Sequence, residues 1–261
     1  MKAAVYQGNK KFSVVPSEPI PPGPGEVRLN VAYCGVCGTD VHIYHGQLDH
    51  RVTPPQVIGH EVSAEVAEVG EGVTGVAPGD RVAVRPVKLG RPAPSDRGFT
   101  HVGKNVKLLG VDTPGGMQAS WTVPADTLHK LPRSVSLEHG ALVEPIAVAC
   151  HDVSLGEVRP GENCVVLGAG PIGLLIALVA RRKGARAILS EINPARRRLA
   201  ESLGLETVNP TEDDLVECVS RATGEAMADV VFEVSGSADG AESMTKVANV
   251  RGRIVMVAIH P

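Results

Sequence analysis

The pattern of apolar and polar residues divides the chain into a strand-rich first part and a second part in which strands alternate with helices. In the first part, apolar and polar residues alternate over 26–34, 61–69 and 81–84. A two-residue period of this kind predicts half-buried β-strands. The proline- and glycine-rich stretch 19–25 excludes a helix or a central strand, because proline lacks an amide donor and has a fixed φ.

Strand and helix patterns alternate from about residue 153 onward. An apolar strand at 163–167 leads into a glycine-rich turn and an apolar helix at 174–182. Four further strands are predicted at 186–192, 206–209, 228–236 and 251–259. This alternation predicts a parallel sheet whose strands are connected by helices. Before it, a helix begins after Ser136 as N-cap and is bent or restarted at Pro145.

Composition narrows the class of protein. The 261 residues are 43% hydrophobic and 21% charged, which fits one large or two ordinary globular domains. A net charge of −3 and 3% aromatic residues favour neither a nucleic acid nor an anionic membrane as partner. The longest apolar run, 172–180, is too short to span a bilayer, and the N-terminus lacks the hydrophobic core of a signal peptide. Five scattered cysteines suit a reducing compartment, so we expect a cytoplasmic protein.

Cys37, His60 and Glu61 are candidate metal ligands, with Glu144 as a further carboxylate. A thiolate, an imidazole and a carboxylate are ligand types of a catalytic zinc, which takes three protein ligands and keeps one position open. Taken singly, each of these residues is explained better as a structural one, such as a buried free thiol or a core histidine. The pair formed by Cys34 and Cys37 does not indicate a redox site, because no thioredoxin-like βαβ unit surrounds it.

The glycine-rich turn is a candidate dinucleotide site. Gly168 permits a tight turn, Gly170 the close approach of a pyrophosphate, and Gly173 the contact between helix and strand. Glu191, at the end of the next strand, would accept the ribose hydroxyls and repel a 2′-phosphate, which favours NAD. Arg196 could receive that phosphate, so NADP stays open. The residues expected to contact the dinucleotide are Gly168, Gly170, Pro171, Ile172, Gly173, Glu191 and Arg196.

Together, the segment from Cys37 to His42, the pair His60-Glu61 and the glycine-rich turn resemble the medium-chain, zinc-dependent alcohol and polyol dehydrogenases. The resemblance is greatest to the branch with sorbitol, threonine and butanediol dehydrogenases. It implies a two-domain α/β fold. A GroES-like β-barrel catalytic domain would span 1–152, and a Rossmann-type doubly wound parallel sheet that binds NAD would span 153–261.

The same resemblance implies roles for individual residues. Cys37, His60 and Glu61 would bind one catalytic zinc, and Glu144 would point at the metal or its water. Which of the two glutamates is the tighter zinc ligand stays open. Thr39 and His42 would form a proton relay that passes the alcohol proton to solvent through the cofactor ribose. Many relatives also bind a structural zinc with four cysteines over 85–116. No cysteine lies between Cys37 and Cys150, which excludes that second site.

The function implied is hydride transfer from a secondary alcohol, polyol or hydroxy amino acid to NAD. Members of the family are usually homodimers or homotetramers. We count about five strands in the second domain instead of six. The chain is therefore expected to be C-terminally truncated, or to be a naturally short form, without the dimer edge strand or the return segment of the catalytic domain. Two alternatives stay open: a catalytically inert nucleotide-binding relative, and a zinc-independent quinone-type reductase, although such reductases lack the set Cys37, His60 and Glu61.

Overall fold

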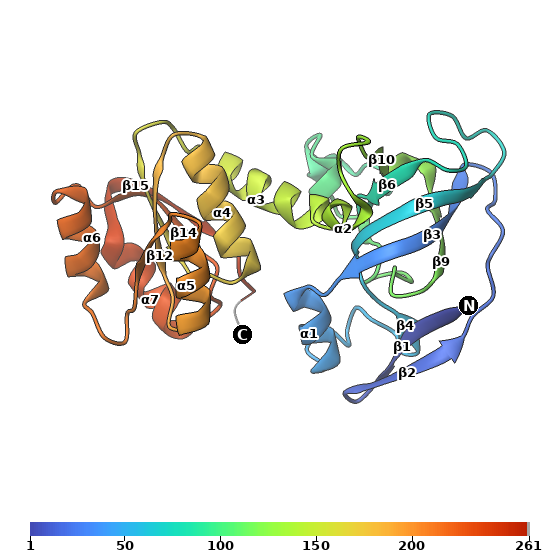
Figure 1. The fold of residues 1–261 in the computed structure, drawn as a ribbon, viewed down its shortest axis with the longest axis horizontal. Coiled ribbons are helices and arrows are strands. Elements are labelled where there is room, and N and C mark those ends of the chain that lie inside the picture. Colours follow the sequence, from blue (N-terminus) through green and yellow to red (C-terminus); the bar gives the residue numbers. More distant parts are fainter. Residues whose placement is uncertain (260–261) are drawn as a thin grey trace. The chain divides into compact units, whose positions relative to one another are not determined.

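The computed structural model describes residues 1–259, and the chain divides into two compact units, Met1–Glu144 and Pro145–Pro261 (Figure 1). This division after Glu144 and the domain boundary predicted after residue 152 both lie within helix α3 (Val143–Leu155). The predicted domain limits, 1–152 and 153–261, therefore stay a prediction. None of the described helices combines the length and the apolar character needed to cross a membrane.

Two antiparallel sheets form most of the first unit, besides a two-stranded sheet in the segment 85–116. The larger has the strand order β10-β6-β5-β3-β9, and the smaller has the order β2-β1-β4. Their strands are β1 (Lys2–Gly8), β2 (Lys11–Pro16), β3 (Glu26–Gly35), β4 (Gln56–Val57), β5 (Glu61–Val69), β6 (Arg81–Val84), β9 (Ser120–Pro124) and β10 (Leu128–Lys130). The helices of this unit are α1 (Gly38–Tyr44) and α2 (Leu137–Gly140), and Ser136 caps α2 by accepting a hydrogen bond from the His139 N–H.

The alternation seen in the sequence produces the core of the larger sheet. Inward-facing residues from four adjacent strands form one buried cluster, which includes Leu29, Val66, Val82 and Trp121. Trp121 is 4% exposed, and its indole N–H donates to the Pro114 carbonyl at 3.2 Å. The single tryptophan is therefore a core residue whose polar atom is satisfied.

The segment 85–116 is ordered without cysteine ligands. It contains the short strands β7 (Val87–Lys88) and β8 (Lys107–Leu108) and two 3₁₀ turns. The Asp96 carboxylate, 9% exposed, accepts the backbone N–H groups of Ala93 at 2.8 Å and Lys104 at 3.0 Å. These hydrogen bonds lower the pKa of Asp96, so this carboxylate ties the two sides of the segment together.

The second unit is a parallel sheet with the strand order β13-β12-β11-β14-β15. Its strands are β11 (Asn163–Leu167), β12 (Arg186–Ser190), β13 (Glu206–Val208), β14 (Ala228–Glu233) and β15 (Ala248–Met256). Its helices are α4 (Pro171–Arg182), α5 (Pro194–Ser202), α6 (Leu215–Thr223) and α7 (Ala238–Val247), together with most of α3. The order reverses between β11 and β14, the switch point at which doubly wound sheets bind ligands.

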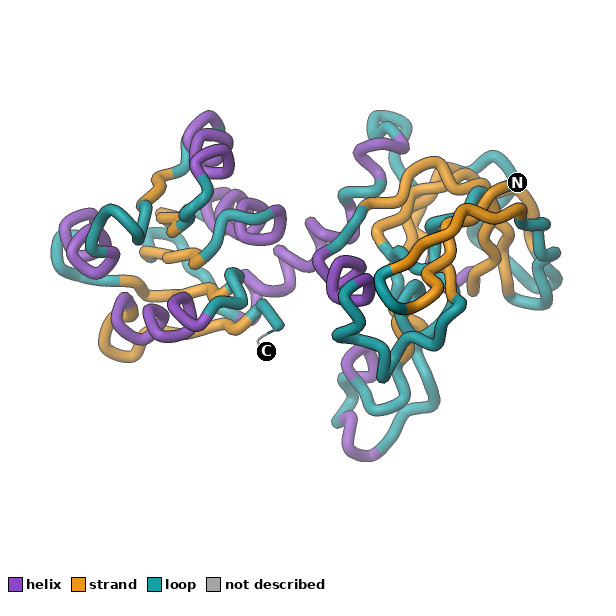
Figure 2. The backbone as a smooth tube through the Cα atoms, turned by 90° about the horizontal axis from the view of Figure 1, so that it is seen from below, coloured by secondary structure: helices purple, strands orange, loops and turns teal. Residues whose placement is uncertain are grey.

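Helices cover both faces of this sheet (Figure 2). Cys164 and Val166 of β11 pack into a cluster with residues of α3, α4 and α5. Val165 and Leu167, the alternate residues of the same strand, pack into a second cluster with α6 and α7. Because both faces are buried, the central strand is a continuous apolar run rather than an alternating one.

Several predicted boundaries are wrong by a few residues, including the end of the strand predicted at 228–236, which is at Glu233. Helix α4 begins at Pro171 rather than at residue 174, because Gly170 is the N-cap and proline suits the first helical position. Strand β12 ends at Ser190 rather than 192, because Glu191 turns back towards the glycine-rich loop. Strand β15 covers Ala248–Met256 instead of 251–259. The last two residues of the predicted second domain, His260 and Pro261, lie outside the described part of the chain.

Candidate metal centre and dinucleotide site

Cys37 lies where strand β3 gives way to helix α1. Cys37 is the N-cap of α1, and its backbone N–H donates to Asp40 Oδ2 at 2.9 Å. An acidic side chain at the third helical position that accepts from the N-cap amide fixes the entry of the chain into the helix. The Cys37 sulfur is thereby held at a defined point beside the end of the sheet.

Glu61 is the first residue of β5, opposite the end of β3, and His60 directly precedes it. The antiparallel register pairs Glu61 with Gly35. A Cβ on Gly35 would come within 2.1 Å of Glu61 Oε2, so glycine provides the space in which this carboxylate lies. His60 is 4% exposed. Strand pairing therefore places a histidine and a glutamate beside Cys37.

The ligand atoms of Cys37, His60 and Glu61 all lie within 4.8 Å of one another. Asp40 is buried behind them, with its Oδ1 3.9 Å from His60 Nδ1. Neither of these two atoms has a hydrogen-bond partner among the residues that the structure describes. The His60 ring thus turns Nδ1 towards a carboxylate, the usual arrangement around a metal-binding histidine.

Burial governs the electrostatics of this cluster. It raises the pKa of the Cys37 thiol and of the Glu61 carboxyl, and it lowers the pKa of the His60 imidazole. Burial and the charge of Glu61 raise the pKa of Glu144 to about 7. The negative charges of Asp40, Glu61 and Glu144 repel one another in this buried cluster. A divalent cation would supply the compensating charge, so the donor set fits a metal ion.

Glu144 lies at the end of the first unit, in the first turn of α3. It is close enough for the Glu61 charge to raise its pKa, but it does not belong to the group whose ligand atoms lie within 4.8 Å. The geometry therefore distinguishes the two carboxylates that the sequence left equivalent.

Thr39 and His42 both lie on α1, three residues apart, and so share one face of the helix. Thr39 Oγ1 is 3.7 Å from Cys37 Sγ, within hydrogen-bonding distance of a sulfur atom. The His42 ring contacts the Gln47 side chain through Nδ1. A hydroxyl thus lies beside the cluster, and an imidazole follows along the same helix.

The glycine-rich turn has the geometry that close packing requires. Gly168 has φ +101°, a backbone angle that residues with a side chain rarely adopt. A Cβ on Gly168 would lie 3.1 Å from the backbone of Ser235. A Cβ on Gly173 would lie 2.0 Å from the Gly168 carbonyl oxygen. By contrast, a Cβ on Gly170 would meet nothing within 4 Å. Space is open at Gly170, and Pro171 and Ile172 follow it in the first turn of α4.

Glu191 lies at the carboxyl end of β12 and is 5% exposed. Its Oε2 accepts the Ala169 N–H and its Oε1 accepts the Asn193 N–H, both at 2.8 Å. Arg196 is more exposed, and its Nη1 lies 3.6 Å from Glu191 Oε2. The predicted carboxylate therefore supports the glycine-rich turn, with an arginine beside it.

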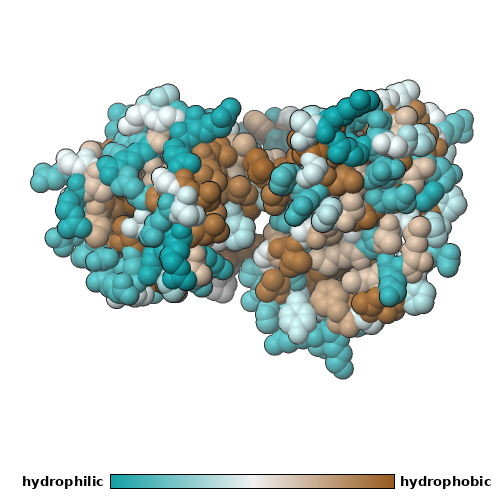
Figure 3. Space-filling view, viewed as in Figure 1, coloured by the Kyte–Doolittle hydropathy of each residue, from teal (hydrophilic) through white to brown (hydrophobic). Residues whose placement is uncertain are grey.

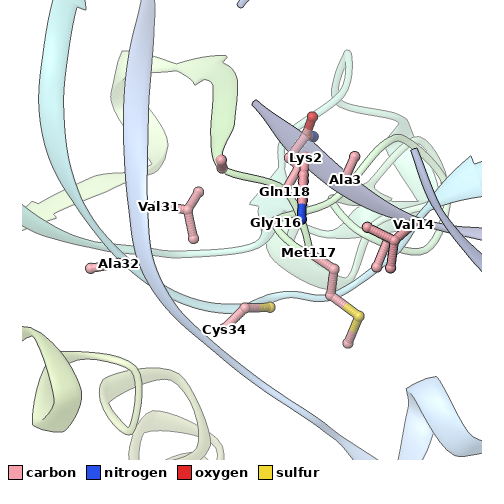
Figure 4. Close-up of a pocket in the computed structure, with 11 residues that line it drawn as sticks. Lys2, Ala3, Val14, Val31, Ala32, Cys34, Gly116, Met117 and Gln118 are labelled. Atoms are coloured by element: carbon pink, nitrogen blue, oxygen red, sulfur yellow. The ribbon is translucent and has the colours of Figure 1, made fainter. Parts of the chain in front are cut away.

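A groove of about 370 Å³ lies elsewhere in the first unit, between β1, β2, β3 and the segment 116–119 (Figure 4). Cys34 and Met117 contribute their sulfur-bearing side chains to its lining. Cys34 thus lines this groove, whereas Cys37 belongs to the cluster with His60 and Glu61.

Two polar residues of these sites were missed from the sequence. Gln47 contacts His42. The sequence feature that could have indicated this contact is Gly46, because a glycine at this place marks the C-terminus of a helix. Glu233 is fully buried at the end of β14, where its carboxylate accepts the Ser235 N–H at 3.0 Å. An apolar strand that ends in an acidic residue gave no specific sign of that contact.

Comparison with known proteins identifies the class. Residues 23–133 match the alcohol dehydrogenase GroES-like domain, and residues 171–261 match the zinc-binding dehydrogenase family. The whole chain is 54% identical to a 2-dehydro-3-deoxy-L-galactonate 5-dehydrogenase of Pseudoalteromonas atlantica and covers 76% of it. An L-threonine 3-dehydrogenase of Pyrococcus horikoshii is 38% identical over 92% of this chain and 70% of its own length.

A solved structure extends the comparison to three dimensions. An NADP-bound zinc-binding dehydrogenase of Sinorhizobium meliloti superposes with a TM-score of 0.94 at 33% identity, over 100% of this chain and 77% of that one. The fold is therefore that of a dehydrogenase with a GroES-like domain and a Rossmann-type domain. The chain belongs to the zinc-binding medium-chain dehydrogenases, in the branch with the threonine and butanediol enzymes, and is an oxidoreductase of the alcohol dehydrogenase type.

Proposed function

We propose that this chain is a zinc-dependent dehydrogenase that oxidises a secondary hydroxyl of a polyol, hydroxy amino acid or sugar acid with NAD. The observation that carries the proposal is the convergence of Cys37, His60 and Glu61 within 4.8 Å. The names of the relatives support the substrate class: one acts on a deoxy sugar acid and another on threonine.

In this proposal zinc is bound by Cys37, His60 through Nε2, and Glu61. Asp40, 3.9 Å from His60 Nδ1, orients the ring and fixes its tautomer. Glu144, whose pKa of about 7 reflects burial beside Glu61, would be the additional carboxylate near these ligands. When bound, zinc acts as a Lewis acid that lowers the pKa of an alcohol hydroxyl.

The residues of α1 move the proton. Thr39 Oγ1, 3.7 Å from Cys37 Sγ, accepts the proton that leaves the alcohol and donates its own. His42 takes up the proton at Nε2 and releases it to water. Positioned groups of this kind contribute about 10²- to 10⁴-fold to a rate.

The second unit supplies the dinucleotide site. The N-terminus of α4 and the open space at Gly170 suit a pyrophosphate, because helix N-termini favour anions. Pro171, Ile172 and Gly173 form the turn of helix that carries this site. Glu191 favours NAD because its buried negative charge repels a 2′-phosphate, while Arg196 is the neighbouring cation that opposes this preference.

The proposal is tested by zinc analysis of the purified chain together with NAD reduction on a panel of polyols, sugar acids and threonine. We expect about one zinc per chain and NADH formation that a chelator abolishes and added zinc restores. Chelator-resistant NADPH oxidation with a quinone would support the alternative of a quinone-type reductase. Zinc and NAD binding without hydride transfer to any substrate would support the inert relative.

Cofactor choice gives a separate prediction at Glu191. Glu191→Gln removes the charge but keeps one acceptor for the two N–H groups of Ala169 and Asn193. We expect the ratio of kcat/KM for NADP to that for NAD to rise about tenfold, which equals about 1.4 kcal/mol. The lost acceptor should lower the free energy of unfolding by about 1–3 kcal/mol.

The matched control for this variant is Arg196→Ala, which leaves the carboxylate and both of its amide contacts in place. It is expected to lower kcat/KM for NADP and to leave that for NAD within about twofold, a change of only about 0.4 kcal/mol. An unmodified protein that prefers NADP, or a Glu191→Gln variant with an unchanged ratio, would contradict the assignment.

A further inference from the structure

Helix α1, which carries Thr39 and His42, ends in a turn that returns the chain onto His42. Gly46 has φ +80°, and its N–H donates to the Ile43 carbonyl at 2.9 Å. The Gln47 N–H donates to the His42 carbonyl at 3.0 Å. These two hydrogen bonds define a Schellman C-cap, which brings the residue after the glycine against the third residue from the end of the helix.

In this protein the two residues brought together by the cap are polar. The contact that accompanies such a cap is usually apolar. Here Gln47 Oε1 forms a close hydrogen bond with His42 Nδ1. An amide oxygen only accepts hydrogen bonds, so Nδ1 carries the proton and Nε2 of the neutral ring keeps a free lone pair.

We propose that Gln47 is a positioning residue for proton transfer, which holds His42 as the Nδ1–H tautomer with Nε2 ready to accept. This inference rests on the proposed function, in which His42 takes up the proton released by the alcohol. The O–H bond of the donor breaks as the Nε2–H bond forms, and the resulting imidazolium then gives the proton to water. Gln47 Oε1 continues to accept from Nδ1–H throughout, so the ring does not have to turn.

The rest of α1 is held independently of the Gln47 side chain. Ile43 and Leu48, on either side of the cap, are buried in one apolar cluster. On the outside, the Tyr44 ring stacks on Phe12 with centroids 6.1 Å apart, in a region where Figure 3 shows apolar side chains at the surface. Gln47 itself is exposed. Its replacement therefore leaves no cavity and preserves the helix, which separates positioning from folding.

The tautomer is read directly by long-range ¹H–¹⁵N NMR of the zinc-loaded protein labelled at histidine, with His42 assigned from the signals missing in His42→Gln. We expect protonated Nδ1 in the unmodified protein, the Nε2–H form or a mixture in Gln47→Leu, and protonated Nδ1 again in Gln47→Glu, which restores the acceptor. His45→Gln, which changes an exposed neighbour, is the control expected to leave the spectrum of His42 unchanged.

Steady-state kinetics supply the second readout. Gln47→Leu is expected to lower kcat about tenfold, a part of the total acid–base contribution, with KM changed less than about twofold. Gln47→Glu should recover most of this loss. Because Gln47 acts through His42, the double variant Gln47→Leu/His42→Gln should be no slower than His42→Gln alone.

The inference is overturned if His42 of the unmodified protein carries its proton on Nε2, as it would with the Gln47 amide reversed. It is also overturned if Gln47→Leu changes neither tautomer nor kcat, or if the effects of the two substitutions multiply. In each of these cases the unmodified protein still reduces NAD. Failure of the proposed function is distinguishable, because the unmodified protein would then show no zinc-dependent NAD reduction.

Discussion

Alanine at Gly173 is expected to destabilise the second unit, whereas alanine at Gly170 is expected to leave the fold intact and to weaken dinucleotide binding. A Cβ on Gly173 would lie 2.0 Å from the Gly168 carbonyl oxygen, which is backbone and has no flexible end to move. Overpacking of a well-packed site costs typically about 1–3 kcal/mol, and a backbone clash belongs at or above the upper end of that range. Chemical denaturation followed by circular dichroism measures the loss.

Gly170 makes this a matched pair within one turn. Its φ is −66°, and a Cβ there would meet nothing within 4 Å, so Gly170→Ala should change the free energy of unfolding by less than about 0.5 kcal/mol. The methyl group would fill the space proposed for the pyrophosphate. The dissociation constant for NAD should therefore rise about 100-fold, which equals a loss of about 2.7 kcal/mol of binding free energy. Calorimetric titration measures this affinity. Undiminished NAD binding by Gly170→Ala would show that the pyrophosphate lies elsewhere.

The sequence predicted well those elements whose limits follow from a local pattern. Strand β5 covers Glu61–Val69 and β6 covers Arg81–Val84, as expected from strict alternation bounded by turns. The start of α4 was predicted late because its first turn consists of the glycine-rich motif, where apolar periodicity is absent. Local patterns thus locate elements but not the residues at which a functional turn begins.

The geometry of the candidate site depends on pairing between strands, which no local pattern contains. Gly35 lies opposite Glu61 only because the β3–β5 register shifts twice, between Arg28 and Leu29 and between Val31 and Tyr33. A one-residue slip reverses the face on which every side chain lies. The sequence therefore indicated which residue types could bind a metal. The structure was needed to show that Cys37, His60 and Glu61 lie together and that Glu144 does not belong to that group.

Replacement of Cys37 by serine is expected to remove the bound metal and to lower kcat/KM at least about 1,000-fold, equivalent to about 4 kcal/mol of transition-state stabilisation. The thiolate is the soft, anionic ligand of the proposed set, and a serine hydroxyl is not deprotonated at neutral pH. The fold should persist, because the Cys37 N–H still donates to Asp40 Oδ2 and caps α1. Metal content is measured by atomic emission alongside activity and thermal unfolding.

Cys34→Ser is the control that gives this test its specificity. Cys34 lies in the same strand–helix segment and is also partly buried, but its thiol contacts the Gly35 carbonyl and it lines the groove with Met117. Burial, followed by the charges of Asp40 and Glu61, raises its pKa to about 12, and its sulfur does not belong to the group whose ligand atoms lie within 4.8 Å of one another. We expect Cys34→Ser to retain zinc and activity. Equal loss of zinc in both variants would mean that the two cysteines act together, and full retention in Cys37→Ser would refute the proposed ligand set.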